Sequence, residues 1–432
     1  MKEYLLRGRI ICPDRVLEDG YIIFKGGFIQ RVGQSNEFDH WPPESGCPAP
    51  AVSPVDECID LSRSGYTIFP GFIDIHIHGA GYWQAAHGQI AELARFLARF
   101  GVTGFLPTLA SATKEEYLEW LGEVKDLREL EEQRELEEVG AAREAGAIRE
   151  TTKGARGARV LGAHMEGPFI NKLSRGGMME ERVREPDLEE CEEYVDAAGG
   201  AIRLMTLSPE LPGAIDLIRY LRSRGIVVSM GHSLAGPEVV AAAVGAGASH
   251  CCHIFNNCPY DNLRKEPGVR RPGIDEAALV NPGVTVEAIA DGIHVDPLML
   301  ELALRSKGLS GMVLITDALP GAGLDDGIYE MPDGRVIKTR KGDGIRLKDT
   351  GALVGSGLTL PLAMKNFMQW MGLRDWEAAQ LVSGNPARVL GEADSGFIEP
   401  GKRADFAILD KDFNCVMTIV GGEIVYDDRM RG

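Results

Sequence analysis

The middle of this 432-residue chain repeats one pattern, in which a short apolar segment precedes a segment whose apolar residues have helical spacing. Eight apolar segments are predicted strands: 72–77, 103–109, 160–165, 202–207, 226–230, 251–255, 284–289 and 312–315. After the first of them, one helix face would carry Leu93, Phe96, Leu97 and Phe100. Strands that alternate with helices are parallel, so eight such units predict an α/β fold with a closed (β/α)8 barrel of the TIM type. A doubly wound open sheet is the alternative.

The two ends of the chain differ from this middle. Residues 4–33 alternate short apolar runs with turn signals, and residues 404–409 and 416–426 have the same character. Two similar ends around a different middle predict one small β-sandwich domain built from both termini. The predicted boundaries are 1–68 for the first part of the sandwich, 69–385 for the barrel and 386–432 for the second part.

One stretch stands apart within the barrel segment. Residues 123–150 hold many acidic and basic side chains, with Leu127 and Leu130 on one possible buried stripe. We interpret it as part of a solvated helical insertion over about 123–157, with a partner-binding element as the alternative.

Charge and cysteine usage exclude several classes of protein. A formal net charge of −18 argues against nucleic-acid binding, which depends on many Lys and Arg contacts with phosphates. No apolar run approaches the roughly 20 residues that a membrane-spanning helix needs, and the N-terminus lacks the features of a signal peptide. The eight cysteines have no paired zinc-binding spacing, so we expect reduced, mostly buried thiols and a cytoplasmic protein.

The histidines indicate where the chemistry lies. Six of the nine fall at or just beyond the ends of predicted strands: His76, His78, His164, His232, His253 and His294. A parallel barrel places its active site at that edge. His76 and His78 are two residues apart on one strand, so their side chains point to the same face and could share one metal ion.

A second set of ligand candidates follows later strands. Glu166 ends an apolar strand just before a Gly-Pro turn, and a buried carboxylate there needs a compensating cation. His232 and His253 each stand just beyond a strand. One carboxylate and two imidazoles form a three-ligand catalytic site for a divalent metal, with zinc the first candidate and iron, manganese or cobalt as alternatives.

Asp317 follows the eighth predicted strand. A carboxylate beside a metal site can accept a proton from water and return it to a leaving group, so Asp317 is the predicted catalytic acid/base. The structural alternative is a helix N-cap.

With these blocks in place, the chain resembles the amidohydrolase superfamily and, within it, the N-acetylglucosamine-6-phosphate deacetylase family. The matching motifs run in the family's order over nearly the whole chain: PGFIDIHIHG at 70–79, HMEGPFIN at 164–171, TLSPE at 206–210, GHS at 231–233, HIFNN at 253–257, ADGIHV at 290–295, ITDA at 315–318, GSGLTL at 355–360, NPARVLG at 385–391 and GFIEPGKRADFAILD at 396–410. HMEGPF and ADGIHV are specific to this branch.

The resemblance implies a homodimer with this barrel and sandwich, acting on an amino-sugar phosphate. It implies Glu166, His232 and His253 as metal ligands, His76 and His78 as a second-metal pair found in some members, and Asp317 as the acid/base. Residues at substrate-contacting positions are Asn256, Asn257, His294 and the 353–355 stretch with Leu353 and Gly355. The phosphate-binding cation of the family comes from the neighbouring subunit.

The chain departs from the family pattern at three places. Gly177 and Met178 stand where the family has Ala-His near the sugar, which removes one polar contact. Cys258 follows the Asn pair in place of a family residue that lines the site. The family's phosphate-binding Arg-Glu-Pro-Gly corresponds to Arg264-Lys265-Glu266-Pro267-Gly268, in which Arg264 could bind phosphate with two hydrogen bonds and Lys265 as a point charge.

The expected reaction is hydrolysis of the acetamido group of N-acetylglucosamine 6-phosphate. The closest alternative is the galacto epimer of the substrate, which differs at one hydroxyl. A cyclic-amide hydrolase of the dihydroorotase type shares the barrel and the HxH pair but needs a carboxylated lysine where this chain has Glu166. A non-catalytic binding barrel is disfavoured because every expected ligand and the acid/base are present.

Overall fold

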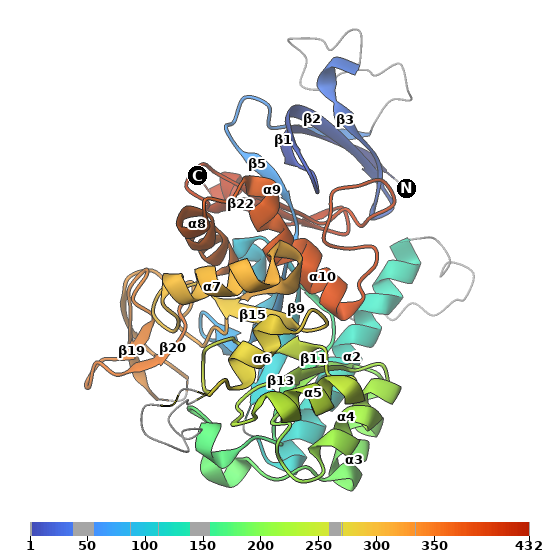
Figure 1. The fold of residues 1–432 in the computed structure, drawn as a ribbon. Helices are drawn as coiled ribbons and strands as arrows, with labels where there is room; N and C mark the ends of the chain where they lie inside the picture. Colours follow the sequence, from blue (N-terminus) through green and yellow to red (C-terminus); the bar gives the residue numbers. More distant parts are fainter. Residues whose placement is uncertain are drawn as a thin grey trace.

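The computed structural model describes residues 2–37, 56–86, 88–110, 112–138, 156–258, 269, 271–332 and 334–431. A barrel surrounded by helices forms the larger part of the molecule, and a β-sheet domain stands at one end of it (Figure 1). The first and last segments of the chain lie together in that smaller domain.

The barrel strands are parallel and follow the chain in order. Their bounds are β6 Phe72–Ile77, β9 Val102–Ala110, β10 Arg159–Val160, β11 Ala163–Glu166, β12 Ile202–Leu207, β13 Val227–Met230, β14 His250–Cys251, β15 Thr285–Ile289 and β16 Met312–Ile315. β10 and β11 pair successively with β9 and together occupy one strand position. The barrel closes just beyond β6 and β16, where Ile77 pairs with Ala318 and the Asp317 amide donates to the His76 carbonyl at 3.0 Å. The predicted (β/α)8 barrel is therefore confirmed.

Helices cover the outside of the barrel. Those of the barrel segment are α1 Ile90–Leu97, α2 Lys114–Glu138, α3 Leu188–Ala198, α4 Ala214–Ser223, α5 Pro237–Ala246, α6 Ile274–Val280, α7 Pro297–Lys307, α8 Leu360–Met371, α9 Asp375–Ala379 and α10 Asn385–Leu390. The predicted apolar face of α1 is buried against the barrel through Leu93, Phe96 and Leu97. Asp187 and Asp296 cap α3 and α7 by accepting hydrogen bonds from backbone amides of the first helical turn.

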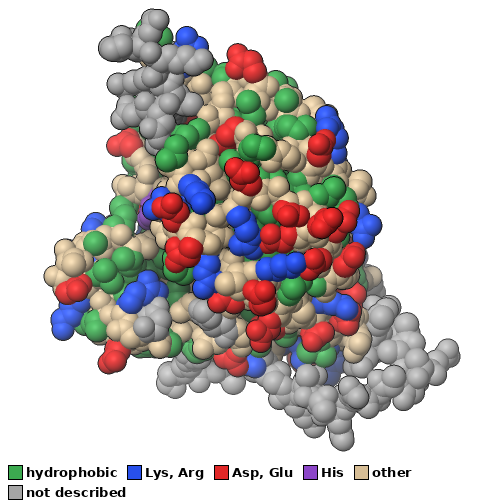
Figure 2. All heavy atoms as spheres, turned by 90° about the horizontal axis from the view of Figure 1, so that it is seen from below, with side chains coloured by type: hydrophobic (Ala, Val, Ile, Leu, Met, Phe, Trp, Pro, Cys, Tyr) green, Lys and Arg blue, Asp and Glu red, His purple; other side chains and the backbone are tan. Residues whose placement is uncertain are grey.

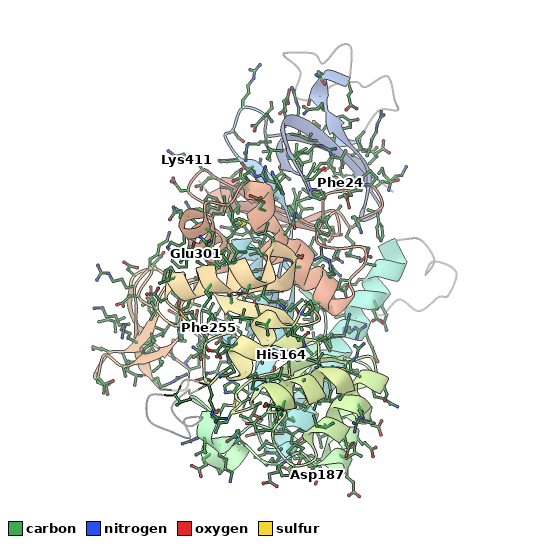
Figure 3. The ribbon with its side chains drawn as sticks, viewed as in Figure 1. Phe24, His164, Asp187, Phe255, Glu301 and Lys411 are labelled. Atoms are coloured by element: carbon green, nitrogen blue, oxygen red, sulfur yellow. The ribbon has the colours of Figure 1, made fainter. Side chains whose placement is uncertain are left out.

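Both chain ends contribute to the smaller domain. Its strands are β1 Glu3–Ile11, β2 Val16–Lys25, β3 Phe28–Gln34, β4 Glu57–Asp60, β5 Thr67–Pro70, β21 Phe406–Leu409, β22 Cys415–Val420 and β23 Glu423–Asp427. β5 pairs with β1 on one side and with β21 on the other, which joins the N-terminal and C-terminal strands into one sheet. Residues from both ends, including Phe24 and Phe406, share one apolar core, and Figure 3 places Phe24 inside this domain. The predicted domain built from both termini is confirmed.

Three details differ from the sequence prediction. The predicted strand 251–255 is wrong in its bounds, because β14 ends at Cys251 and Phe255 already has a positive φ of 67° in the following loop. The predicted strand 160–165 is interrupted at Gly162, which has a φ of 140°. A four-stranded antiparallel sheet after β16 was not predicted; its strands are β17 Gly327–Glu330, β18 Val336–Thr339, β19 Ile345–Leu347 and β20 Leu353–Gly355.

The charged insertion is described only in part. Its first residues belong to α2, on which Leu127 and Leu130 are half-buried, and residues 139–155 lie outside the described residues. None of the helices in the described part of the chain combines the length and apolar character needed to span a bilayer. On the face drawn in Figure 2, acidic and basic side chains are interspersed rather than gathered by sign.

Candidate active site

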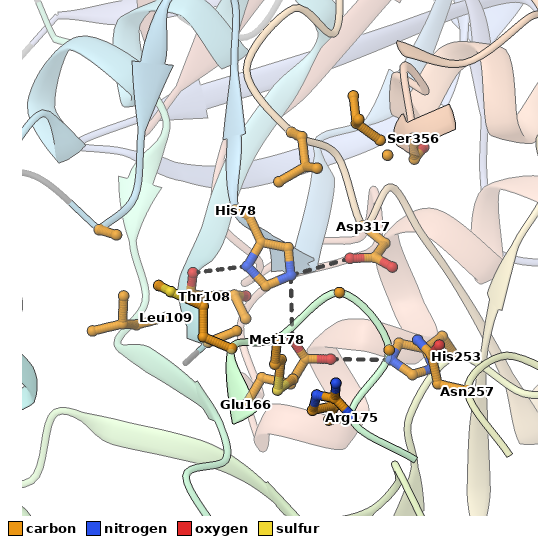
Figure 4. A pocket seen from close by; sticks show the side chains of 18 of the residues that line it. His78, Thr108, Leu109, Glu166, Arg175, Met178, His253, Asn257, Asp317 and Ser356 are labelled. Carbon is orange, nitrogen blue, oxygen red and sulfur yellow. Dashed lines mark hydrogen bonds and ion pairs between the residues drawn. The ribbon is translucent and has the colours of Figure 1, made fainter. Parts of the chain in front are cut away.

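A cavity of about 720 Å³ opens at the carboxyl ends of the barrel strands (Figure 4). Most of the residues predicted from the sequence line it: His78, Glu166, Gly177, Met178, His232, His253, Asn256, Asn257, His294, Asp317, Leu353 and Gly355. His76 is fully buried behind this wall and contacts two of the lining carboxylates. Arg264 and Lys265 lie outside the described residues.

Glu166 is at the centre of the cluster. Its Oε1 atom is 2.9 Å from His232 Nε2 and 3.0 Å from His253 Nε2, and these two nitrogens are 3.1 Å apart. His232 Nδ1 donates to the Ser174 carbonyl at 2.8 Å, so Nε2 is the nitrogen that can bind a proton or a metal ion beside Glu166. A carboxylate oxygen and imidazole lone pairs that converge this closely form a donor set suited to one cation.

The HxH pair faces the same carboxylate. His78 Nδ1 donates to the Thr108 carbonyl at 3.1 Å, and its Nε2 atom is 3.4 Å from Glu166 Oε2 and 3.1 Å from Asp317 Oδ1. His76 Nε2 is 3.5 Å from Glu166 Oε1 and 3.6 Å from Asp317 Oδ1, without a hydrogen bond among the described residues. Two groups of side chains could therefore hold a metal ion: His76, Glu166, Cys252 and His253, and His76, His78 and Asp317.

The electrostatics show how strongly this cluster attracts positive charge. Burial disfavours charge on the His78 ring, yet the Asp317 and Glu166 carboxylates raise its pKa to about 9. Burial acts against the Glu166 carboxylate as well, but the imidazoles of His76 and His232 hold its pKa well below its usual range. The carboxylates thus draw protons onto the imidazoles, and a divalent cation would displace those protons by binding the same atoms.

Several site residues sit in loops with unusual backbone conformations. His232, Phe255, Asn257 and Asp317 have φ values of 49°, 67°, 54° and 46°, which non-glycine residues rarely adopt. Such conformations cost free energy and persist where the surroundings hold them. In the described part of the chain, four of the five non-glycine residues with positive φ lie at this edge of the barrel, which marks it as a functional site.

The cavity wall opposite the Glu166 cluster comes from two loops and from the four-stranded sheet β17–β20. His294 Nδ1 is 2.6 Å from Asp291 Oδ2, which orients the ring beside the cavity. β20 brings Leu353 and Gly355 to the cavity, so the sheet that the sequence did not predict supplies part of the wall. Gly176 has a φ of 59°, and a side chain there would meet Asn257 at 2.6 Å, so the loop before Met178 packs tightly onto the asparagine.

Other buried residues around this cluster were missed at the sequence level. Glu287 is fully buried in β15 and contacts His76 Nδ1 at 2.9 Å, and Cys252 Sγ lies 3.8 Å from Glu166 Oε1. Asp74 is fully buried in β6, accepts a 2.6 Å hydrogen bond from the Thr316 hydroxyl, and has its pKa raised to about 7 by burial. An acidic residue inside an otherwise apolar strand, as at 74 and 287, was the available signal.

His164 has a different place from the other strand-end histidines. Its fully buried ring lies between the hydroxyls of Thr108 and Thr206 at 3.3 Å and 2.8 Å. Burial, with the neighbouring His76, lowers its pKa well below the usual value. It packs edge-on against the His76 ring at 4.5 Å between centroids and so helps to hold that ring in position.

Comparison with known proteins gives the class of this barrel. The model of the amidohydrolase family matches residues 67–425, and the chain belongs to the amidohydrolase family. The chain is 31% identical to the N-acetylglucosamine-6-phosphate deacetylase of Bacillus subtilis, over 96% of this chain and 95% of that protein. It is 30% identical to the N-acetylgalactosamine-6-phosphate deacetylase of Escherichia coli O157:H7, over 87% of this chain and 91% of that protein.

A solved structure agrees with this placement. The N-acetylglucosamine-6-phosphate deacetylase of Thermotoga maritima superposes with a TM-score of 0.74 and 30% identity, over 97% of this chain and 98% of that chain. The likeness extends over barrel and terminal domain together, so the whole architecture is shared.

Proposed function

We propose that this amidohydrolase removes the acetyl group of N-acetyl-D-glucosamine 6-phosphate to give glucosamine 6-phosphate and acetate. The observation that carries the proposal is the convergence of Glu166, His232, His253 and Asp317 at one end of the cavity. The relatives named above supply the substrate class, since the Bacillus subtilis and Thermotoga maritima proteins are deacetylases of this sugar phosphate.

The residues present fit a divalent metal, with Zn²⁺ the first candidate. Glu166, His232 and His253 would hold one ion, and His76 and His78 with Asp317 would hold a second. Such an ion supplies a Lewis acid for the acetamido carbonyl and makes water a better nucleophile near neutral pH.

Asp317 performs the proton transfers in this proposal. Its carboxylate accepts a proton from the water that attacks the acetamido carbon, and then delivers it to the sugar nitrogen as the C–N bond breaks. Its Oδ1 atom is 3.1 Å from His78 Nε2, and the side chain remains partly open to the cavity. The neighbouring imidazoles hold the pKa of Asp317 below its usual value against the effect of burial, which keeps the carboxylate ready to accept a proton.

The remaining lining residues would position the sugar. His294, held by Asp291, and the amides of Asn256 and Asn257 offer hydrogen bonds to hydroxyl or carbonyl groups. Gly177, Met178, Leu353 and Gly355 would contact the sugar through backbone or apolar atoms.

The phosphate needs a cation in an acidic protein. We propose Arg264 and Lys265, acting from the neighbouring subunit of a homodimer, in the family's manner. Among the described residues, Arg175 also lines the cavity; it donates to the Lys172 carbonyl at 2.9 Å and approaches Glu180 only to 3.7 Å. Its remaining donors make Arg175 the alternative phosphate ligand.

The deciding experiment is a deacetylation assay on a panel of acetylated sugars, combined with metal analysis. We expect N-acetylglucosamine 6-phosphate to give the highest kcat/KM, above the galacto epimer and the unphosphorylated sugar. Glu166→Gln should lower metal content and rate together. Full metal content and full rate in that variant would show that the site is elsewhere.

The phosphate ligands can be tested separately. Replacing both Arg264 and Lys265 with alanine should raise KM for the phosphorylated sugar far more than for the plain sugar, at roughly 1.5 to 3 kcal/mol per lost contact. Arg175→Ala is the comparison variant. Equal kinetics of the unmodified enzyme on both sugars would contradict the phosphate proposal.

The epimer of this substrate remains a second candidate because one relative is an N-acetylgalactosamine-6-phosphate deacetylase. A higher kcat/KM on the galacto substrate in the same panel would select it. We further propose a cytoplasmic homodimer that binds no nucleic acid, in keeping with the net charge of −18.

A further inference from the structure

Glu287 is a buried carboxylate that the proposed reaction does not use. It lies in β15 with no exposed surface and does not belong to the cavity wall. A carboxylate without access to water is costly unless hydrogen-bond donors or cations surround it. The neighbours that compensate Glu287 therefore indicate what it does.

Those neighbours belong to the two elements that carry the metal-binding histidines. Glu287 Oε2 is 2.9 Å from His76 Nδ1, and it accepts a hydrogen bond from the His253 backbone amide at 3.1 Å. β6 and the loop after β14 are thus attached to a single oxygen atom. The Glu287 carbonyl also accepts from the Ile254 amide at 2.9 Å, which holds the same loop a second time.

The other oxygen is held by a histidine remote from the cavity. Glu287 Oε1 is 3.0 Å from His250 Nε2, and His250 Nδ1 is 2.6 Å from the Thr285 hydroxyl. His250 is fully buried and fixed at both nitrogens, so it fixes the orientation of the carboxylate in turn. The chain Thr285, His250, Glu287, His76 runs through the barrel interior beneath the cavity.

This arrangement determines which nitrogen of His76 can bind a metal. An ionised carboxylate only accepts hydrogen bonds, so His76 Nδ1 carries a proton and Nε2 is the nitrogen left to bind a metal ion. His76 Nε2 is the atom that faces Glu166 and Asp317 and has no hydrogen bond in the described part of the chain. A carboxylate behind a ligating histidine fixes the ring and makes it more basic.

We propose that Glu287 is a positioning residue of the metal centre: it sets the tautomer of His76 and the position of the His253 loop, and so sets the affinity for the metal ion. This rests on the proposed role of these histidines as ligands. It does not depend on which sugar is the substrate.

The test measures metal affinity rather than turnover. The purified full-length protein is stripped of metal and titrated with Zn²⁺ against a chelator, and the Co²⁺-loaded protein gives a visible spectrum. Glu287→Ala should bind metal about 10- to 100-fold more weakly, with an altered Co²⁺ spectrum. Glu287→Gln keeps the shape and one acceptor oxygen, so it should recover part of the loss.

Two controls separate positioning from general destabilisation. Asp405→Asn removes another buried carboxylate, one that pairs with Arg159 at 3.1 Å away from the cavity, and should leave metal affinity unchanged. In a protein that already carries His76→Ala, Glu287→Ala should lower the metal affinity by a smaller factor than it does alone, because both changes act through one ligand. Unchanged metal affinity in both Glu287 variants would overturn the proposal. It would also be overturned if the double variant lost affinity by the full product of the two single-variant losses. If the protein deacetylates none of the sugars, the metal titration still gives a result. The proposed function and the proposed role of Glu287 can therefore fail separately.

Discussion

Buried carboxylates have different partners in two regions: the site at the strand ends and the domain formed by the two termini. Between domain and barrel, Asp405 is buried with the cations Arg159 and Arg403, at 3.1 Å and 3.4 Å. At the site, Glu166 and Asp317 face nitrogens of histidines. In His76, His78 and His232 the other ring nitrogen already makes a contact with a carbonyl or carboxylate oxygen. The first arrangement pairs a carboxylate with two arginines, whereas the second places carboxylates against imidazole nitrogens that could also bind a metal ion. This contrast agrees with our proposal that the strand-end cluster binds a metal ion, and it favours a role in stability for the Asp405 cluster.

The largest effect that would sharpen this contrast is expected at Asp317. Asp317→Asn keeps the shape of the side chain but cannot accept a proton, so kcat should fall by about 10²- to 10⁴-fold. The ion proposed at Glu166, His232 and His253 should stay bound, and thermal unfolding should change little. Asp349→Asn, on an exposed turn, is the matched control. A loss of less than tenfold would assign the proton transfer to another group.

In the core of the terminal domain we expect a loss of stability with little change in kcat. Phe406 is fully buried in β21 and packs edge-on against Phe24 at 5.6 Å between ring centroids. Phe406→Ala should lower the free energy of unfolding by about 3–5 kcal/mol. The kcat of the folded protein should stay near that of the unmodified enzyme. Ile424→Ala in β23, at an exposed position, should change stability by less than about 0.5 kcal/mol. A large loss of kcat with Phe406→Ala would break the division between the two regions.

A smaller effect with a defined pH dependence is expected at Asp405. Burial opposes ionisation, but Arg159 and Arg403 lower the pKa of Asp405 below that of the unfolded chain. Its contribution is therefore present above the unfolded pKa, near 3.9, and is lost as the pH falls through the folded pKa. Asp405→Asn should cost about 1–3 kcal/mol at neutral pH, and its stability should fall less steeply in acid. Parallel stability curves for both proteins in acid would contradict this.

The smallest predicted effect concerns a contact between the terminal domain and the outside of the barrel. The Thr418 hydroxyl in β22 donates to the Ala98 carbonyl at 2.6 Å, and that carbonyl also accepts from the Gly101 amide. Thr418→Val should cost about 1 kcal/mol of stability without a change in KM. Thermal unfolding and steady-state kinetics check both parts. A raised KM would mean that the terminal domain influences the site through this contact.

Much of the barrel could be predicted because its strands are buried on both faces. The segments 72–77, 202–207 and 312–315 match β6, β12 and β16 residue for residue, since these segments are mostly apolar and are followed by polar residues. The sheet β17–β20 escaped prediction because its strands are short and half-exposed, as in β17, where burial alternates between intermediate and exposed. Such strands carry little periodic signal.

For the site, the sequence indicated residues but not their connections. His76, His78, Glu166, His232, His253 and Asp317 were recognised as strand-end groups, and the structure places them together. Glu287 and Asp74 were passed over as parts of mostly apolar strands, because these side chains pair outside their own strands: Glu287 with His250 and His76, and Asp74 with Thr316. Which side chains meet across a barrel depends on the stagger of its strands, and a single sequence does not contain that register.

The pairing of β5 with β21 also has a consequence for synthesis on the ribosome. Pro70 pairs with Phe406, so one edge of β5 waits for a partner that is made more than 300 residues later. At typical rates of about 5–20 residues per second, that wait lasts tens of seconds, during which an apolar strand edge stays open. The terminal domain is thus completed after the barrel segment has been synthesised, and a nascent chain halted before β21 would be exposed to aggregation and would need chaperones.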